Sequence, residues 1–161
     1  MHHDKLDEID IQILEILQRE GRTKRNELAE AVKLSIPSIS ERLRKLEEND
    51  VLHGYNAILN PKKAGLGVTA FILILADSST ANPEFVERAI NHMEILECHS
   101  ITGEGSHILK IRTKNTETLE KLINQIHTWR GVKDTRTMVA LSSIKETTVV
   151  PLDYLQKKRR K

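Results

Sequence analysis

The 161-residue sequence predicts an α+β fold in two parts, three N-terminal helices followed by a β-α-β-β-α-β unit. Two patterns predict this division. Up to residue 50 the apolar residues recur every three or four positions, as in amphipathic helices. After residue 67, short apolar runs typical of strands alternate with two further helical patterns. Since a chain of this length suffices for one domain or two small ones, we expect two small domains connected by residues 51–67.

Three helices are predicted in residues 1–50. The stretch LDEIDIQILEILQREG has helical spacing and ends at a glycine, and TKRNELAEAV follows with Thr23 as its expected N-cap. A third helix is expected from Ser35 to about Asn49, with Pro37 in its first turn, where the amides have no helical partner. The last two helices and the short turn between them predict a helix-turn-helix arrangement.

The turn and the third helix each carry a specific expectation. Lys33 occupies a turn position where the backbone favours positive φ, a conformation that costs a lysine about 1 kcal/mol. The apolar residues of the third helix fall on one face, which we expect to pack against the other two helices. They are Ile36, Ile39, Leu43 and Leu46.

The remaining residues of the third helix predict a DNA-reading surface. An α-helix fits the major groove of B-DNA, where arginine donates two hydrogen bonds to guanine while serine and lysine mostly hold phosphates. The candidate DNA-binding residues are Ser35, Pro37, Ser38, Ser40, Glu41, Arg42, Arg44 and Lys45. The alternative is a solvated helix with ordinary surface charge, and the surrounding helix-turn-helix favours the reading surface.

Overall charge does not decide between these interpretations. The net charge is +2, and residues 1–60 contain nine Lys and Arg against twelve Asp and Glu. Because the N-terminal part is slightly acidic, an interaction with DNA depends on where the cations cluster.

The rest of the chain predicts a ferredoxin-like βαββαβ sandwich, with two helices on one face of an antiparallel sheet. Residues 51–67 are expected to form a linking strand and hinge, and 68–161 the sandwich with a basic C-terminal tail. The expected helix over 82–93 has five candidate inward-facing residues, Phe85, Val86, Ala89, Ile90 and Met93. The other sheet face stays open, which indicates a partner.

Several classes of protein are disfavoured. The longest apolar run, residues 70–76, is too short for a bilayer, which needs about 20 residues. With no signal pattern at its N-terminus, the chain is expected to be cytoplasmic. The single cysteine, Cys98, excludes a disulfide within one chain. Its neighbour His99 should point to the opposite sheet face, so the two side chains are not expected to bind one metal ion. No catalytic constellation stands out, so we expect no enzyme, cofactor or metal.

These motifs together resemble the Lrp/AsnC family of feast/famine transcriptional regulators over nearly the whole length. The resemblance is carried by LDEIDIQILEILQREGR, ELAEAVKLSIPSISERLRKLEENDVLHGYNAILNPKKAGLG, LECHSITGE and TRTMVALSSIKE. It implies a helix-turn-helix domain that binds double-stranded DNA and a ligand-sensing αβ-sandwich. It also implies homodimers formed by paired sheets, commonly octamers, with an amino-acid effector between dimers.

The resemblance also places an effector site. Family members usually carry Gly-Asp-Tyr-Asp-Tyr in the loop between the middle strands, where this chain has Gly-Glu-Gly-Ser-His. The candidate effector-binding residues are Thr102, Gly103, Glu104, Gly105, Ser106, His107, Thr135 and Thr137. A hydroxyl replaces the second acid and both aromatic side chains are gone, and a carboxylate holds an ammonium better than a hydroxyl does. We therefore expect a changed or lost amino-acid preference; the two threonines are equally explained as strand formers.

Three functional classes are compared. A sequence-specific regulator leads, and an architectural DNA-binding protein of low sequence specificity is the nearest alternative. A metabolite-binding module built on the sandwich is disfavoured because the helical domain is intact. The basic tail, residues 157–161, is expected either to touch DNA phosphates or to act as a solubilising end.

Overall fold

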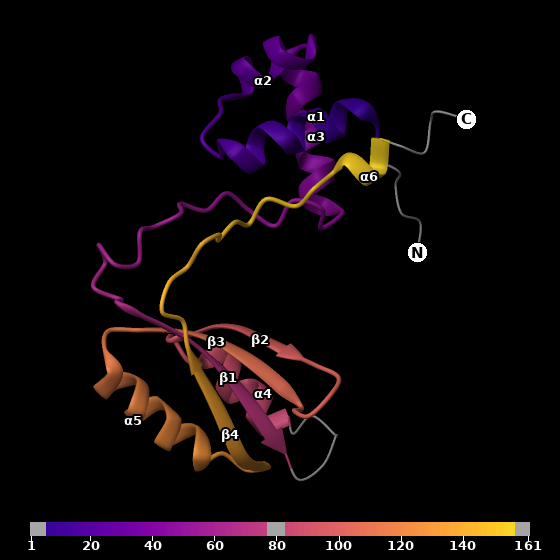
Figure 1. Ribbon diagram of the computed structural model, residues 1–161. Coiled ribbons are helices and arrows are strands. Elements are labelled where there is room, and N and C mark those ends of the chain that lie inside the picture. Colours follow the sequence, from indigo (N-terminus) through magenta and orange to yellow (C-terminus); the bar gives the residue numbers. More distant parts are fainter. Residues whose placement is uncertain (1–5, 77–82, 157–161) are drawn as a thin grey trace. The chain divides into compact units, whose positions relative to one another are not determined.

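The computed structural model describes residues 6–76 and 83–156. They form two compact units (Figure 1). The first contains the N-terminal helices to residue 58 together with the C-terminal segment from residue 145, and the second contains residues 59–144. The segment 145–156 therefore belongs to the helical unit, whereas the sequence had assigned it to the sandwich.

The helical unit contains α1 (Glu8–Arg19), α2 (Arg25–Val32) and α3 (Ile36–Glu48). Asp7 caps α1 through a capping box, because its carboxylate accepts from the Asp10 amide and its own amide donates to the Asp10 carboxylate. The N-cap of α2 is Lys24 rather than the predicted Thr23, and the Lys24 amide donates to the Glu27 carboxylate over 2.8 Å. The hydroxyl of Thr23 is instead turned back to a carbonyl of the preceding turn.

The three helices enclose one apolar core, to which each contributes buried residues. Its buried residues are Ile13, Leu14, Leu17, Leu28, Ala29, Val32, Ile39, Leu43 and Leu46. The assignment of Ile36 to this core is wrong, because its side chain is 50% exposed. Ile36 is the first residue of α3, and the helix has no buried residue before Ile39.

The predicted linking strand is not formed. Residues 52–60 have no regular secondary structure, and Ile58 and Leu59 are 81% and 73% exposed. A strand needs a neighbour for its backbone hydrogen bonds, and none of the described strands pairs with this segment. Residues 61–65 then make a helical turn, closed by the Leu66 amide on the Pro61 carbonyl.

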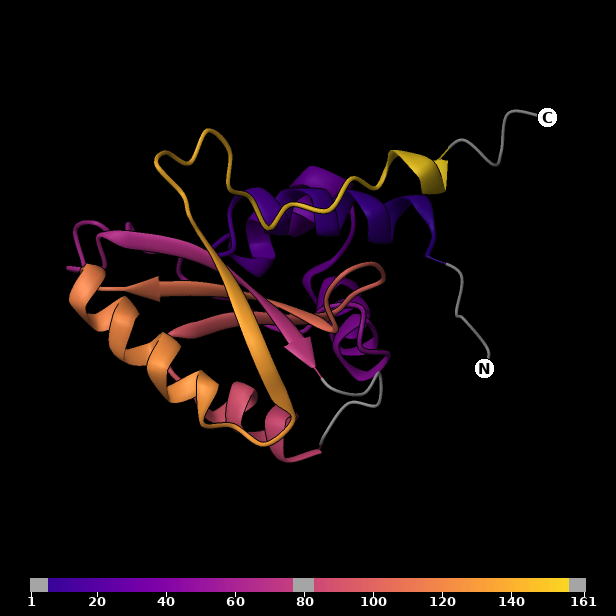
Figure 2. The same cartoon turned by 60° about the horizontal axis from the view of Figure 1, so that its bottom comes forward.

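The second unit is the predicted ferredoxin-like sandwich. Its strands lie in the order β2-β3-β1-β4, all neighbours antiparallel. Helices α4 and α5 cover the same face of the sheet, as Figure 2 shows. The elements are β1 (Val68–Ala76), α4 (Pro83–Asn91), β2 (Ile95–Ser100), β3 (His107–Thr113), α5 (Thr116–His127) and β4 (Val132–Val139).

The sandwich core lies between the sheet and these helices. Strand residues two apart point to the same face, and one face of β1 supplies Ala70, Ile72 and Ile74, all buried. Phe85 and Ala89 of α4 are buried in this core, as predicted. The prediction that Ile90 and Met93 face inward is wrong, because their side chains are 75% and 94% exposed. Ile90 lies a third of a turn from Ala89, and Met93 lies beyond the end of the helix.

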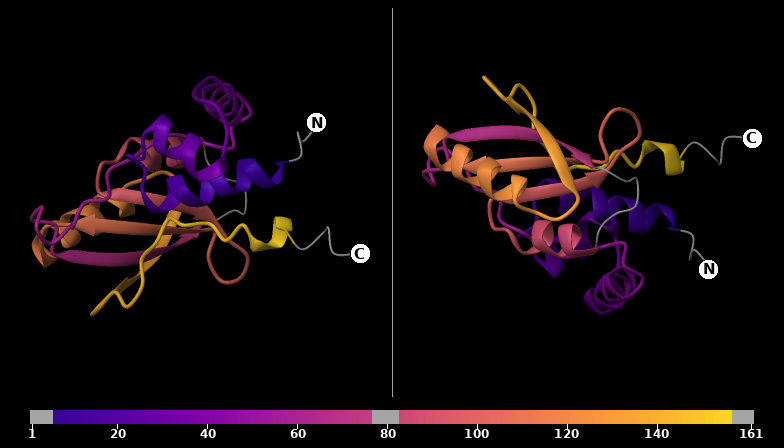
Figure 3. Two further views of the ribbon diagram at one scale, coloured as in Figure 1. Left: turned by 90° about the horizontal axis from the view of Figure 1, so that it is seen from above. Right: turned by 90° about the horizontal axis from the view of Figure 1, so that it is seen from below.

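The C-terminal segment runs along the helical unit without strand structure and ends in the short helix α6 (Asp153–Gln156), drawn in yellow in Figure 3. The side-chain amide of Gln18 on α1 donates to the Val150 carbonyl over 3.1 Å and accepts from the Val150 amide over 2.6 Å. Leu152 packs against the three-helix core. Among the described residues, no helix has the length and apolarity needed to cross a membrane.

Candidate functional site

The turn before α3 has the predicted left-handed geometry. Lys33 has φ 56° and ψ 46°, which lets the Leu34 amide reach the Ala29 carbonyl over 2.9 Å. The Ser35 hydroxyl accepts from the Ser38 amide and makes a 2.8 Å hydrogen bond with the Ser38 hydroxyl. These bonds end α2 and start α3 sharply, which fixes the angle at which α3 leaves the turn.

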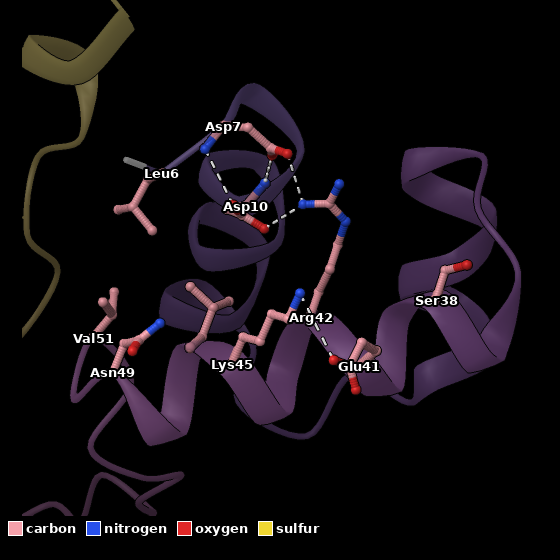
Figure 4. A pocket seen from close by; sticks show the side chains of 10 residues that line it. Leu6, Asp7, Asp10, Ser38, Glu41, Arg42, Lys45, Asn49 and Val51 are labelled. Atoms are coloured by element: carbon pink, nitrogen blue, oxygen red, sulfur yellow. Dashed lines mark hydrogen bonds and ion pairs between the residues drawn. The ribbon is translucent and has the colours of Figure 1, made fainter. Parts of the chain in front are cut away.

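The structure brings most of the predicted DNA-binding residues onto one exposed face of α3. Ser35, Pro37, Ser38, Glu41, Arg44 and Lys45 are exposed. Ser40 and Arg42 are only partly exposed. Beside this face lies an open groove of about 530 Å³ between the start of α1 and α3 (Figure 4). Its polar lining is a mixture of Asp7, Asp10, Ser38, Glu41, Arg42, Lys45 and Asn49.

Arg42 points across this groove to α1 instead of outward. Its Nη1 donates to Asp7 Oδ2 over 2.8 Å and to Asp10 Oδ1 over 2.6 Å. Burial alone would raise the pKa of Asp7, but the Asp10 amide and the Arg42 guanidinium outweigh it and hold the pKa below its ordinary value. Burial likewise opposes the charge on Arg42, and both carboxylates outweigh it and raise the pKa of Arg42.

Arg44 and Lys45 take their partners from their own helix. Arg44 donates to Glu41 over 2.7 and 3.0 Å and to Glu48 over 2.5 Å, while Lys45 Nζ lies 3.7 Å from Glu41. The hydrogen bond from Arg44 lowers the pKa of Glu41, and the two carboxylates raise the pKa of Arg44. These pairs are exposed, so water screens them and they exchange at little cost.

The predicted effector loop folds down onto β1. The Ser106 amide donates to the Ile74 carbonyl over 2.9 Å, and the Ser106 hydroxyl reaches the same oxygen over 3.3 Å. A Cβ atom on Gly105 would lie 2.4 Å from Leu73 Cδ1, so any other residue there forces a rearrangement. Glu104 is ion-paired with Arg136 of β4.

The two effector candidates of β4 lie on the helix-covered sheet face. Thr135 and Thr137 pair with Ile74 and Ile72, whose side chains are buried under the helices. Thr135 Oγ1 hydrogen-bonds His127 Nε2 over 2.8 Å. Arg136, which lies between these threonines, points to the opposite face. Within one chain the threonines and the Glu104 carboxylate are therefore not on the same side of the sheet.

His107 lies on the buried side of the loop. Its ring centroid is 4.9 Å from that of Phe85, and its side chain is 7% exposed. Burial lowers the pKa of His107, because the charged imidazolium loses hydration. Thr102 and Gly103 are exposed in the loop, with φ of Gly103 at 113°.

Three partners were missed by the sequence interpretation. The first is the pair Asp7 and Asp10, whose N-cap spacing marks the start of α1 and gives no indication of a bond to α3. The second is Arg136, which alternation places opposite the threonines beside it. The third is Gln18, whose hydrogen bonds to the distant Val150 no local pattern indicates.

A metal centre is not formed by the described side chains. Over residues 6–76 and 83–156 no group of three or more His, Cys, Asp or Glu could hold a metal ion. Cys98 is half-buried against the sandwich core, and burial raises the pKa of its thiol.

Comparison with known proteins finds the same two units. The Lrp/AsnC ligand binding domain matches residues 69–150, and a winged helix-turn-helix DNA-binding domain matches residues 6–52. The HTH-type transcriptional regulator FL11 of Pyrococcus furiosus is 35% identical over 91% of this chain and 97% of its own. The leucine-responsive regulatory protein of Haemophilus influenzae is 35% identical over 91% and 90%.

Solved structures agree with these matches. A transcriptional regulator of Neisseria meningitidis, determined as a complex with L-methionine, superposes with a TM-score of 0.87 at 32% identity, over 93% of this chain and 99% of that one. A feast or famine regulatory protein of Mycobacterium tuberculosis, also complexed with L-methionine, gives 0.81 at 31% identity, over 90% and 98%. With both domains matched in order and relatives aligned nearly end to end, the chain belongs to the Lrp/AsnC family of transcriptional regulators.

Proposed function

We propose that α3 is the recognition helix of a sequence-specific DNA-binding regulator, and that its exposed polar residues divide the contacts. The major groove is contacted by Arg44, Lys45, Glu41 and Ser38. At the start of the helix, the sugar-phosphate backbone of the DNA is contacted by Ser35 and Pro37. Ser40 lies at the edge of the contact. The observation that carries this proposal is the exposed polar face of α3, fixed in direction by the left-handed turn at Lys33.

Arg42 has a different role in this proposal. Two carboxylates at the start of α1 hold its guanidinium, so Arg42 positions the recognition helix. If Arg42 turned to DNA, these two neighbouring acids would lose their partner. This replaces the expectation from the sequence that Arg42 reads a base.

Glu41 favours sequence-specific reading over architectural binding. A protein that binds only the phosphate backbone gains nothing from an exposed carboxylate in the middle of its contact face, because phosphates repel it. In the major groove the same carboxylate can accept a hydrogen bond from the amino group of cytosine.

Fluorescence anisotropy with competing duplexes tests the assignment. The parent chain should prefer a selected site over random duplex by about a thousandfold or more at physiological salt. Arg44→Ala should weaken binding to the selected site by about tenfold or more. Lys62→Ala, which removes an exposed cation outside α3, is the matched control. Equal competition by random duplex would instead favour the architectural alternative.

We further propose that the effector is an amino acid, as in the two relatives whose structures are complexes with L-methionine. The loop around Glu104 would hold its ammonium. This carboxylate is already paired with Arg136, and the loop has lost its aromatic side chains and its second acid. An incoming ammonium must therefore displace a resident cation, which supports an altered preference.

Titration calorimetry against the twenty amino acids, L-methionine included, tests this proposal. Arg136→Ala should strengthen binding of an amino acid by freeing Glu104, and Glu104→Gln should abolish it. Glu117→Gln, which removes an exposed carboxylate on α5, is the control. Unchanged affinity in all three variants would exclude the loop as the ammonium site.

The protein is further proposed to work in the cytoplasm as a homodimer, or as an octamer assembled from four dimers, without catalysing a reaction. The sheet face opposite α4 and α5 supports self-association, because it carries the apolar residues Phe71, Leu73 and Met138, of which Met138 is 51% exposed. Light scattering behind size exclusion, at several protein concentrations, measures the assembly.

A further inference from the structure

Glu41 and Arg44 are joined by two hydrogen bonds on the exposed face of α3. Arg44 Nε donates to one carboxylate oxygen of Glu41 over 3.0 Å, and Arg44 Nη2 donates to the other over 2.7 Å. The side chains are half exposed, at 52% for Arg44 and 50% for Glu41. Because two parallel hydrogen bonds align the planes of both groups, each side chain orients the other.

The outer edge of the Arg44 guanidinium can be turned to guanine. Glu41 takes the edge formed by Nε and Nη2, and Nη1 donates to Glu48. Glu48 is the last residue of α3, where the helix dipole disfavours a carboxylate, and its pair with Arg44 is exposed. Release of Glu48 therefore costs little, and the edge formed by Nη1 and Nη2 can then donate to O6 and N7 of guanine.

Glu41 keeps acceptor capacity while it holds Arg44. A carboxylate has about four lone-pair sites, and the two hydrogen bonds from Arg44 leave the others free for a base. In the major groove a carboxylate accepts from the amino group of cytosine, whereas on adenine the N7 acceptor beside the amino group repels it. The hydrogen bond from Arg44 lowers the pKa of Glu41, so the acceptor stays anionic at neutral pH.

We propose that Glu41 and Arg44 together specify two adjacent G·C base pairs, with Arg44 on the guanine of one and Glu41 on the cytosine of the next. This inference rests on the proposed recognition-helix function and names part of its DNA site. The bonded atoms lie 2.7 and 3.0 Å apart, and successive base pairs lie about 3.4 Å apart, so the two side chains span a single step. Glu41 contacts one base and also orients the guanidinium that contacts the other.

Duplexes with altered bases test both contacts. A duplex selected from a random pool by the parent chain should contain two adjacent G·C base pairs. Replacing the contacted guanine by 7-deazaguanine, which lacks N7, should weaken parental binding about tenfold. Replacing the contacted cytosine by N4-methylcytosine, whose methyl group takes the place of the exposed amino hydrogen, should have a similar effect. If no G·C base pair of the selected site responds to these replacements, the proposal is overturned.

Two variants assign each loss to its side chain. Arg44→Lys keeps the positive charge but lacks the planar guanidinium, so it should no longer distinguish guanine from 7-deazaguanine. Glu41→Ala should bind cytosine and N4-methylcytosine equally. It should also lose most of its discrimination at guanine, because Arg44 is no longer oriented. Parental discrimination at either base in Glu41→Ala would overturn the proposal.

Glu48→Ala is the matched control, because it removes the other exposed carboxylate bonded to Arg44. Glu41→Ala and Glu48→Ala each remove one negative charge, so both should bind random duplex severalfold more tightly at low salt. Only Glu41→Ala should lose preference for the selected site, by about tenfold or more. An equal loss in Glu48→Ala would mean that negative charge beside Arg44 sets the preference, and would overturn the contact to cytosine.

The two functional claims fail in distinguishable ways. If the parent prefers no selected duplex over random duplex, the recognition-helix proposal fails, and the assignment of the G·C base pairs fails with it. If the parent prefers a selected site but the altered bases and the variants lack these effects, only the assignment of the G·C base pairs fails.

Discussion

Replacing Arg42 by alanine separates positioning of the recognition helix from reading of the bases. The change removes two hydrogen bonds between charged groups, of 2.8 and 2.6 Å, which link α3 to the start of α1. Such bonds are worth about 1.5–3 kcal/mol each when well shielded. The Arg42 and Asp10 side chains are 27% and 17% exposed and Asp7 is 43% exposed, so solvent screening reduces the total loss to about 1–2 kcal/mol.

The two units allow this loss to be assigned. Urea unfolding followed by circular dichroism reports all the helices, whereas the fluorescence of Trp129, the single tryptophan, reports the sandwich alone. Arg42→Ala should shift the helical transition and leave the Trp129 transition in place. Arg44→Ala is the control, since its exposed partners lie on its own helix; it should leave both transitions unchanged and weaken only DNA binding.

Acid provides a second measurement of the same contact. The pKa of Asp7 in the folded chain lies below its ordinary value, so its contribution to stability is complete above about pH 4 and is lost as the pH falls through the lower folded value. Arg42→Ala should reduce this loss, because the cation that helps to lower the pKa is gone. If Arg42→Ala leaves unfolding and its acid dependence unchanged yet weakens DNA binding as much as Arg44→Ala, the positioning role is refuted.

Further outcomes follow from single contacts. Lys33→Gly should raise the free energy of unfolding of the helical unit by up to about 1 kcal/mol, because glycine accepts φ 56° without strain. A lower free energy of unfolding, measured by urea unfolding, would contradict this. Gly105→Ala should destabilise the sandwich by about 1–3 kcal/mol, because the added methyl group collides with Leu73. The Trp129 fluorescence transition should therefore occur at a lower urea concentration. An unchanged transition would mean that the loop moves freely. The pKa of His107 is lowered by burial, so the sandwich should lose stability as the pH falls below about 6.5 toward the folded value. His107→Phe should flatten this dependence between pH 7 and pH 5, and an unaltered slope would assign it to another group.

Periodicity predicted the elements that bury one face. Phe85 and Ala89 of α4 are buried where the helical spacing placed them, as are Ile39 and Leu43 of α3. It failed where an element ends, as at Ile36 and Met93, because a residue beyond the last turn of contact keeps its apolar character without a surface to cover. Alternation also failed at residues 51–60, since a strand depends on a partner that the pattern does not contain.

Connections between distant parts of the chain were outside the reach of the pattern. The attachment of Val150 to Gln18 joins residues that are 132 positions apart, and neither residue type signals it. The ion pair between Glu104 and Arg136 spans 32 positions. In the loop the substitutions themselves were visible, but only the structure shows that the glycine allows close contact with β1.

The two arginines of α3 show why sequence assigns charge to a surface more readily than it assigns a role. Both lie outside the apolar stripe, and by composition alone both qualify for base contact. Arg42 takes its partners from another helix, so its bonds fix the packing of α3 and cannot be released without cost to that packing. Arg44 takes its partners from the preceding and following turns of α3 itself. Those partners accompany it wherever the helix docks, and an exposed pair exchanges readily for a phosphate or a guanine. The origin of the partner, which only the fold reveals, therefore decides which cation is available to DNA.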